Sequence, residues 1–98
     1  MIVNFSKDTK DFLFNNQNYI AKDNPTAAKR YTSKLIKRIV DMLQFPNIGK
    51  INTVFDDDSI REITLDGMKI IYKKVPKSVI VLMVYRYIDF DESQLDIE

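Results

Sequence analysis

The residue types present limit the chemistry open to this chain. It contains no histidine and no cysteine, which excludes Ser–His and Cys–His nucleophilic sites as well as the usual zinc sites. It has only two glycines and neither a GxGxxG nor a GxxxxGK[ST] motif, so it cannot build a glycine-rich phosphate-binding loop. The side chains left for a site are therefore carboxylates, cations and tyrosines.

Three consecutive carboxylates, Asp56 to Asp58, stand out among the acidic residues. A metal-binding loop needs oxygen ligands that converge from spaced positions. Consecutive carboxylates between two strand-like segments are more typical of a solvated turn. We therefore predict no metal site here.

Cationic residues form two patterns. Residues 60–65 alternate, with Ile60 and Glu62 on one face and Arg61, Ile63 and Leu65 on the other. Arg86 and Tyr87 end an apolar segment without an obvious packing reason. Four further cations fall at i, i+4, i+7 and i+8, on one side of a predicted helix. They are Arg30, Lys34, Lys37 and Arg38. Such a stripe is usually a solvated helix face, and the functional alternative is a docking surface for an acidic partner or for DNA.

Two helices are predicted to carry the first half of the chain. Ser6 can cap a helix over residues 7–22, with a core-facing stripe of Leu13, Tyr19 and Ile20. Asn24 can cap a longer amphipathic helix, and Pro25 fits its first position, where no backbone N–H is needed. A tight turn over residues 22–24 would make the pair an antiparallel helical hairpin.

The second helix has the stronger apolar periodicity, and Pro46 is expected to end it because a proline disfavours the α conformation of the residue before it. Its apolar positions recur at helical spacing. They are Ala28, Tyr31, Leu35, Ile39 and Met42.

The second half of the chain is predicted to form strands, and a further short strand is predicted at the N-terminus, over residues 1–5. The predicted segments are 51–55, 60–65, 68–75 and 79–87. Asp66-Gly67 suits a two-residue type I′ hairpin turn. The last segment is apolar almost throughout, which favours a central strand covered on both faces or nearly so. The predicted order is β-α-α-β-β-β-β, an α+β fold with the helical hairpin on a mostly antiparallel sheet.

Composition indicates one soluble domain. The chain has 98 residues, 45% of them hydrophobic and 30% charged, and its net charge is +1. No apolar run approaches the roughly 20 residues that span a bilayer, and the N-terminus lacks the pattern of a signal peptide. We expect a cytoplasmic protein that spans residues 1–98 as a single domain, with an acidic tail over residues 89–98. The low net charge weakens the interpretation as a nucleic-acid binder, but does not remove it, because charge can cluster on one face.

Several strings resemble a known family. "AKDNPTAAKRY", "FPNIGK" and "IREI…G…IIY" resemble the ParE/RelE superfamily of toxins from bacterial type II toxin–antitoxin modules, most closely the ParE, plasmid-stabilisation branch. The resemblance covers nearly the whole chain and implies a two-layer fold with a curved sheet.

The resemblance implies three possible functions. The first is a toxin that is not an enzyme and inhibits growth by poisoning DNA gyrase, which the near-neutral charge and the missing histidine favour. The second is a metal-independent, ribosome-dependent mRNA endoribonuclease of the RelE type, in which cationic residues and tyrosine must serve as acid, base and phosphate ligands. The third is a non-toxic module that only binds an antitoxin.

Site residues follow from the same resemblance. A ribonuclease would use Arg61, Lys73, Arg86 and Tyr87, and the predicted target-binding residues are Lys50, Arg61, Arg86 and Tyr87.

A cognate antitoxin is expected, whose disordered C-terminal segment folds on the toxin to form a hetero-oligomer. Phe14, Arg30, Lys34 and Arg38 are predicted to bind it. We predict no cofactor and no membrane partner.

Overall fold

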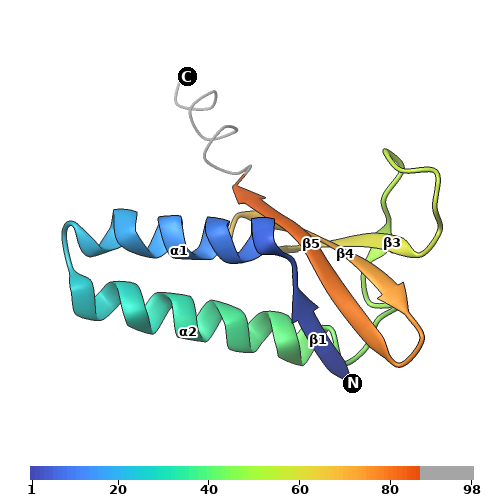
Figure 1. Cartoon of the computed structure of the whole chain (residues 1–98), viewed down its shortest axis with the longest axis horizontal. Coiled ribbons are helices and arrows are strands. Elements are labelled where there is room, and N and C mark those ends of the chain that lie inside the picture. Colours follow the sequence, from blue (N-terminus) through green and yellow to red (C-terminus); the bar gives the residue numbers. More distant parts are fainter. Residues whose placement is uncertain (87–98) are drawn as a thin grey trace.

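The computed structural model describes residues 1–86, and Tyr87 and the acidic tail lie outside this range. Two helices pack on one face of a five-stranded sheet (Figure 1). The elements in chain order are β1 (Ile2–Phe5), α1 (Lys7–Ala21), α2 (Pro25–Met42), β2 (Lys50–Ile51), β3 (Ile60–Leu65), β4 (Met68–Val75) and β5 (Ser78–Arg86). This is the predicted β-α-α-β-β-β-β order.

The sheet has the strand order β1-β5-β4-β3-β2. β1 pairs with β5 in parallel, and the other three pairings are antiparallel. The mostly antiparallel sheet predicted from the sequence is thus confirmed. No helix within residues 1–86 is both long and apolar enough to cross a membrane.

Both helix starts follow the local sequence. The Ser6 hydroxyl accepts the Thr9 N–H at 3.1 Å, and the Asn24 side chain accepts the Ala27 N–H at 3.0 Å. Pro25 occupies the first turn of α2, where its missing N–H leaves nothing unsatisfied. The predicted caps are confirmed.

The turn at Asp66 and Gly67 has positive φ angles of 53° and 77°. Two successive positive φ values are the mark of a type I′ turn, which joins β3 to β4 in the register Leu65↔Met68. The predicted hairpin is confirmed.

The core lies between the helices and the sheet. α2 buries Leu35 and Ile39 in it, and Leu43 follows just after the helix, while α1 contributes Leu13. The predicted core-facing stripe of α1 is wrong at Tyr19, whose side chain is 68% exposed. The Lys22 ammonium instead lies 5.8 Å from the centre of its ring, a distance at which a cation is attracted to the ring face.

The predicted strand over residues 51–55 is largely wrong, because β2 ends at Ile51. The Asn52 side chain accepts the Val54 N–H at 2.8 Å, and the Asp57 carboxylate accepts the Ser59 N–H at 2.9 Å. These local bonds from side chain to backbone compete with strand pairing. Residues 52–59 therefore form a loop between β2 and β3.

β5 is an interior strand, but the prediction that both its faces are covered is wrong within residues 1–86. Val79, Val81 and Val84 face the helices, whereas Met83 and Tyr85 remain exposed on the opposite face. The register shift opposite Ile71 and Tyr72 of β4 leaves one extra residue, Leu82, in β5. We refer to the surface opposite the helices as the open face.

Residues at the N-terminus of α1 form hydrogen bonds with backbone carbonyl groups at the bulge in β5. The Ser6 hydroxyl donates to the Leu82 carbonyl at 2.8 Å, and the buried Thr9 hydroxyl donates to the Val81 carbonyl at 3.1 Å. Ser6 also donates its backbone N–H to Val81. One helix cap thus fixes the bulge in the central part of the sheet.

We expect Thr9→Val to lower the free energy of unfolding by about 1–2 kcal/mol, because it removes a buried donor while keeping the side-chain shape. Urea denaturation measures the loss. Thr26→Val, the same change at an exposed position in α2, is the control. Equal losses in the two variants would mean that replacing a threonine by valine in a helix, not losing the bond to β5, sets the cost.

Candidate functional site

The open face carries an apolar pocket of about 420 Å³. The loop between β2 and β3 forms one side of it and the strands β4 and β5 form the other. Its lining residues are Asn52, Val54, Phe55, Ile71, Met83 and Tyr85. Val54 is 83% exposed and Met83 43% exposed, so the lining is apolar surface that residues 1–86 leave uncovered. An exposed apolar patch of this kind typically marks an interaction site.

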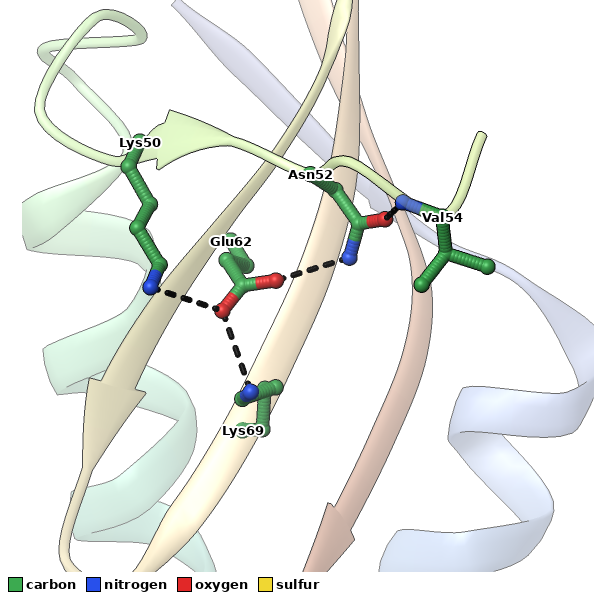
Figure 2. A network of polar contacts seen from close by, with 5 residues as sticks. All are labelled: Lys50, Asn52, Val54, Glu62 and Lys69. Carbon is green, nitrogen blue, oxygen red and sulfur yellow. Dashed lines mark hydrogen bonds and ion pairs between the residues drawn. The ribbon is translucent and has the colours of Figure 1, made fainter. Parts of the chain in front are cut away.

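A buried carboxylate, Glu62 on β3, is hydrogen-bonded to the pocket-lining residue Asn52 (Figure 2). It is only 8% exposed. The Asn52 side-chain amide donates to one carboxylate oxygen at 2.7 Å, while the other oxygen lies 3.1 Å from the Lys69 ammonium and 3.8 Å from that of Lys50. We call Lys50, Asn52, Glu62 and Lys69 the Glu62 cluster.

The Glu62 cluster connects the pocket to three strands. Asn52 both lines the pocket and holds Glu62, and it also accepts the Val54 N–H that shapes the loop (Figure 2). Glu62 is buried while the Lys50 side chain is 79% exposed. The cluster therefore presents positive charge to solvent and hides its negative charge.

A second network fastens the segment between α2 and β2 to the sheet. The fully buried Tyr72 donates its hydroxyl to the Pro46 carbonyl at 2.7 Å and accepts the Gly49 N–H at 3.0 Å. Arg61 donates to the Gly49 carbonyl at 2.7 Å. Burial raises the pKa of Tyr72, and the Gly49 N–H and the Arg61 charge oppose this rise in part.

Gly49 is required in this network because of close approach. A Cβ atom at position 49 would overlap the Glu62 carbonyl oxygen and the Tyr72 hydroxyl. Only glycine lets the backbone approach both groups at once. The "FPNIGK" string is thus a segment held by the sheet beneath it.

The residues predicted to bind a target lie in different places. Arg61 is half-buried on the helix side of β3 and holds Gly49. Lys50 belongs to the Glu62 cluster on the open face. Lys73 pairs with Asp57 at 3.4 Å, and hydrogen bonds from Ser59, with a smaller contribution from Lys73, lower the pKa of Asp57.

Arg86 and Arg61 do not converge. Arg86 donates to the Asn16 side chain of α1 at 2.7 Å. Arg86 of β5 pairs with Met68 of β4, whereas Arg61 of β3 pairs with Tyr72 of β4. Met68 and Tyr72 are four residues apart, which is about 13 Å along the strand. The two arginines also come from strands on either side of β4.

The residues predicted to bind an antitoxin are on the helices rather than the open face. Phe14 is 64% exposed on α1, as expected for a residue outside the apolar stripe. Arg30 and Lys34 are exposed on α2. Arg38 forms an ion pair with Asp66 of the β3–β4 turn at 2.7 Å, so it also ties α2 to the sheet.

Sequence reasoning missed the pocket and the role of Glu62. The alternation of residues 60–65 correctly put Ile60 and Glu62 on one face. The sequence did hold one signal for this cluster. Glu62 shares a strand face with the apolar Ile60, and a carboxylate that is buried on such a face needs hydrogen-bond or ion-pair partners. Residues 1–86 contain no group of three or more acidic residues placed to hold a metal ion.

We expect Tyr72→Phe to lower the free energy of unfolding by about 1–3 kcal/mol at pH 7, because it leaves the Pro46 carbonyl and the Gly49 N–H without this partner. Tyr85→Phe, on the open face, is the control and should cost much less. Because the folded pKa of Tyr72 is raised above its usual 10.0, its contribution is complete below pH 10 and is lost as the pH rises through the folded value. Urea denaturation should show that the difference in free energy of unfolding between wild type and Tyr72→Phe becomes smaller above pH 10. A difference that stays constant with pH would contradict this prediction.

We expect Glu62→Gln to lower the free energy of unfolding by about 1–2 kcal/mol, because the amide keeps the bond from Asn52 but loses both ion pairs of a buried group. The control is Asp41→Asn, which removes the exposed pair with Lys37 and should change stability by less than about 0.5 kcal/mol. Thermal and urea unfolding give both values. A Glu62→Gln variant as stable as the control would show that the ion pairs contribute nothing.

The chain is similar to known toxins. Its fold matches a solved structure titled "Chromosomal ParDE TA system from P. aeruginosa", with a TM-score of 0.70, 16% identity, and coverage of 88% of this chain and 95% of that one. A comparison with curated proteins finds no significant match. Residues 3–86 match the sequence profile described as the ParE toxin of the type II toxin–antitoxin system parDE. This match spans nearly all the described residues, and the chain therefore belongs to the ParE toxin family.

Proposed function

We propose that this chain inhibits bacterial growth by binding and poisoning DNA gyrase in the cytoplasm, and that a cognate antitoxin neutralises it. The observation that carries the proposal is the separation of Arg61 from Arg86. Each of the cations Lys73, Arg61 and Arg86 contacts a different part of the described chain. This arrangement suits a binding surface better than an acid–base site, which needs its groups at one point.

The open face is the proposed target surface. It combines an uncovered apolar pocket with the exposed Lys50 of the Glu62 cluster. Apolar anchors surrounded by charge are typical of protein interfaces. Among the predicted target-binding residues within residues 1–86, Lys50 lies on this face.

The antitoxin is proposed to contact the helical hairpin. A toxin of this family that matches a ParDE system in fold is expected to have a ParD-type partner. Phe14, Arg30 and Lys34 offer an exposed aromatic ring and two cations on the helices. An amphipathic acidic segment would complement that surface.

One observation favours the ribosome as an alternative target. All 15 Lys and Arg residues lie within residues 1–86, together with nine of the 14 Asp and Glu residues, so this part of the chain has a net charge of +6. A positive charge of this size favours contact with RNA. The near-neutral net charge of the whole chain therefore includes a cationic part, which supports the RelE-type alternative.

The test is a supercoiling and cleavage assay with purified full-length protein, gyrase, ATP and plasmid. We expect loss of supercoiling and accumulation of linear, protein-linked DNA, reversed by the antitoxin. Val54→Asp should weaken the effect at least tenfold, because it places a charge in the pocket without disturbing a buried residue. Ser33→Asp, on the exposed surface of α2, is the matched control.

The other outcomes identify the alternatives. Growth arrest without an effect on gyrase, accompanied by cleavage of translated mRNA, would assign the ribonuclease function. A folded protein that binds an antitoxin but neither arrests growth nor affects either target would be a non-toxic module. Arg61→Ala is a poor probe for any of these, because it also removes the bond that holds Gly49.

A further inference from the structure

The charges of this chain are unequally distributed. Residues 1–86 carry a net charge of +6, whereas residues 87–98 contain five Asp and Glu residues and no Lys or Arg, a net charge of −5. The near-neutral chain is thus a cationic domain attached to an anionic segment of 12 residues. Opposite charges joined by a short connection attract strongly, because one end of the chain keeps the other at high effective concentration.

The anionic segment also carries apolar side chains. Four of them are separated by acidic or polar residues: Ile88, Phe90, Leu95 and Ile97. A segment with these residues has apolar surface to bury and charge to leave in solvent. We call residues 87–98 the tail.

The tail begins beside the pocket. Tyr85 lines the pocket, and Arg86 ends β5 one residue before the tail starts. Each residue of an extended chain spans at most about 3.6 Å, so Phe90, five residues after the lining residue Tyr85, can lie up to about 18 Å from it. Val54, Phe55 and Met83 supply the exposed apolar surface there.

Charges around the pocket decide how the tail can lie. The ammonium groups of Lys50 and Lys69 both approach Glu62, whose charge they offset (Figure 2). The Lys50 side chain is largely exposed. The carboxylates of Asp56 to Asp58 lie on the loop beyond Phe55. Attraction on the side of the cluster and repulsion on the side of this loop favour acidic tail residues above Lys50 and Lys69.

We propose that the tail folds back on the open face of its own chain, with Phe90 in the pocket and its carboxylates near Lys50 and Lys69. The tail is then an intramolecular occupant of the surface that a partner would need. A partner that binds the open face must displace it. The occupancy concerns the free protein and stands or falls independently of the toxin's target.

The experiment uses the absence of cysteine. Ser93→Cys gives a single site for a nitroxide spin label in the full-length chain, and ¹³C labelling of the methionine methyl groups gives four reporters. Met83 lines the pocket, whereas Met42 and Met68 lie on the helix side of the sheet. We expect the label to enhance relaxation of the Met83 methyl group at least threefold more than that of Met42 or Met68.

Two comparisons separate occupancy from simple proximity. Adding Phe90→Ser to the labelled chain should reduce the enhancement at Met83 at least threefold, whereas Gln94→Ala should leave it unchanged. Unaltered Met42 and Met68 signals confirm that the fold persists. A label at Asp23→Cys, in the turn between the helices, should not affect Met83.

Either of two results would overturn the proposal. Similar enhancement at Met83, Met42 and Met68 would show that the tail has no preferred site. Enhancement at Met83 that Phe90→Ser leaves unchanged would show that chain connectivity alone brings the label near the pocket.

Discussion

The hydroxyl group of Tyr72 joins the two halves of this protein. Through its bonds to Pro46 and Gly49, it fixes where the chain leaves α2 and enters the sheet at β2. Arg61 holds the same segment through the Gly49 carbonyl. β2 can then place Lys50 against Glu62, and the loop that follows can bring Asn52 to Glu62 and form one side of the pocket. The position of the open-face site therefore depends on a hydrogen-bond network on the opposite side of the sheet.

The fold was predictable because its determinants are local. Asn24 and Pro25 start a helix wherever they lie in a sequence, and Asp66-Gly67 imposes one kind of hairpin turn. The candidate site was not predictable because its determinants are not local. The exposure of Met83 and Tyr85 depends on the extra residue Leu82, and that bulge is stabilised by residues more than 70 positions away, in the first turn of α1.

The strings that carry the family resemblance have structural roles in this chain. "AKDNPTAAKRY" contains the cap and first turns of α2, and "FPNIGK" is the segment held by Tyr72 and Arg61. Such residues specify how the chain folds more directly than what it binds. The functional residues must then be sought on the surface that these strings position, where Val54 and Met83 belong to less distinctive stretches. Fold and family therefore follow from the sequence more readily than the target does.

The parallel pairing of β1 with β5 has a consequence for biosynthesis. Its contacts, such as Ile2 with Ser78, join the first and last strands of the described chain. Contacts with such a large sequence separation form late, because closing a long loop costs entropy before any pairing offsets it. On a translating ribosome, β1 has no strand partner until β5 has emerged from the exit tunnel. The sheet can thus be completed only once β5 has left the exit tunnel, so the fully folded domain cannot appear before that point.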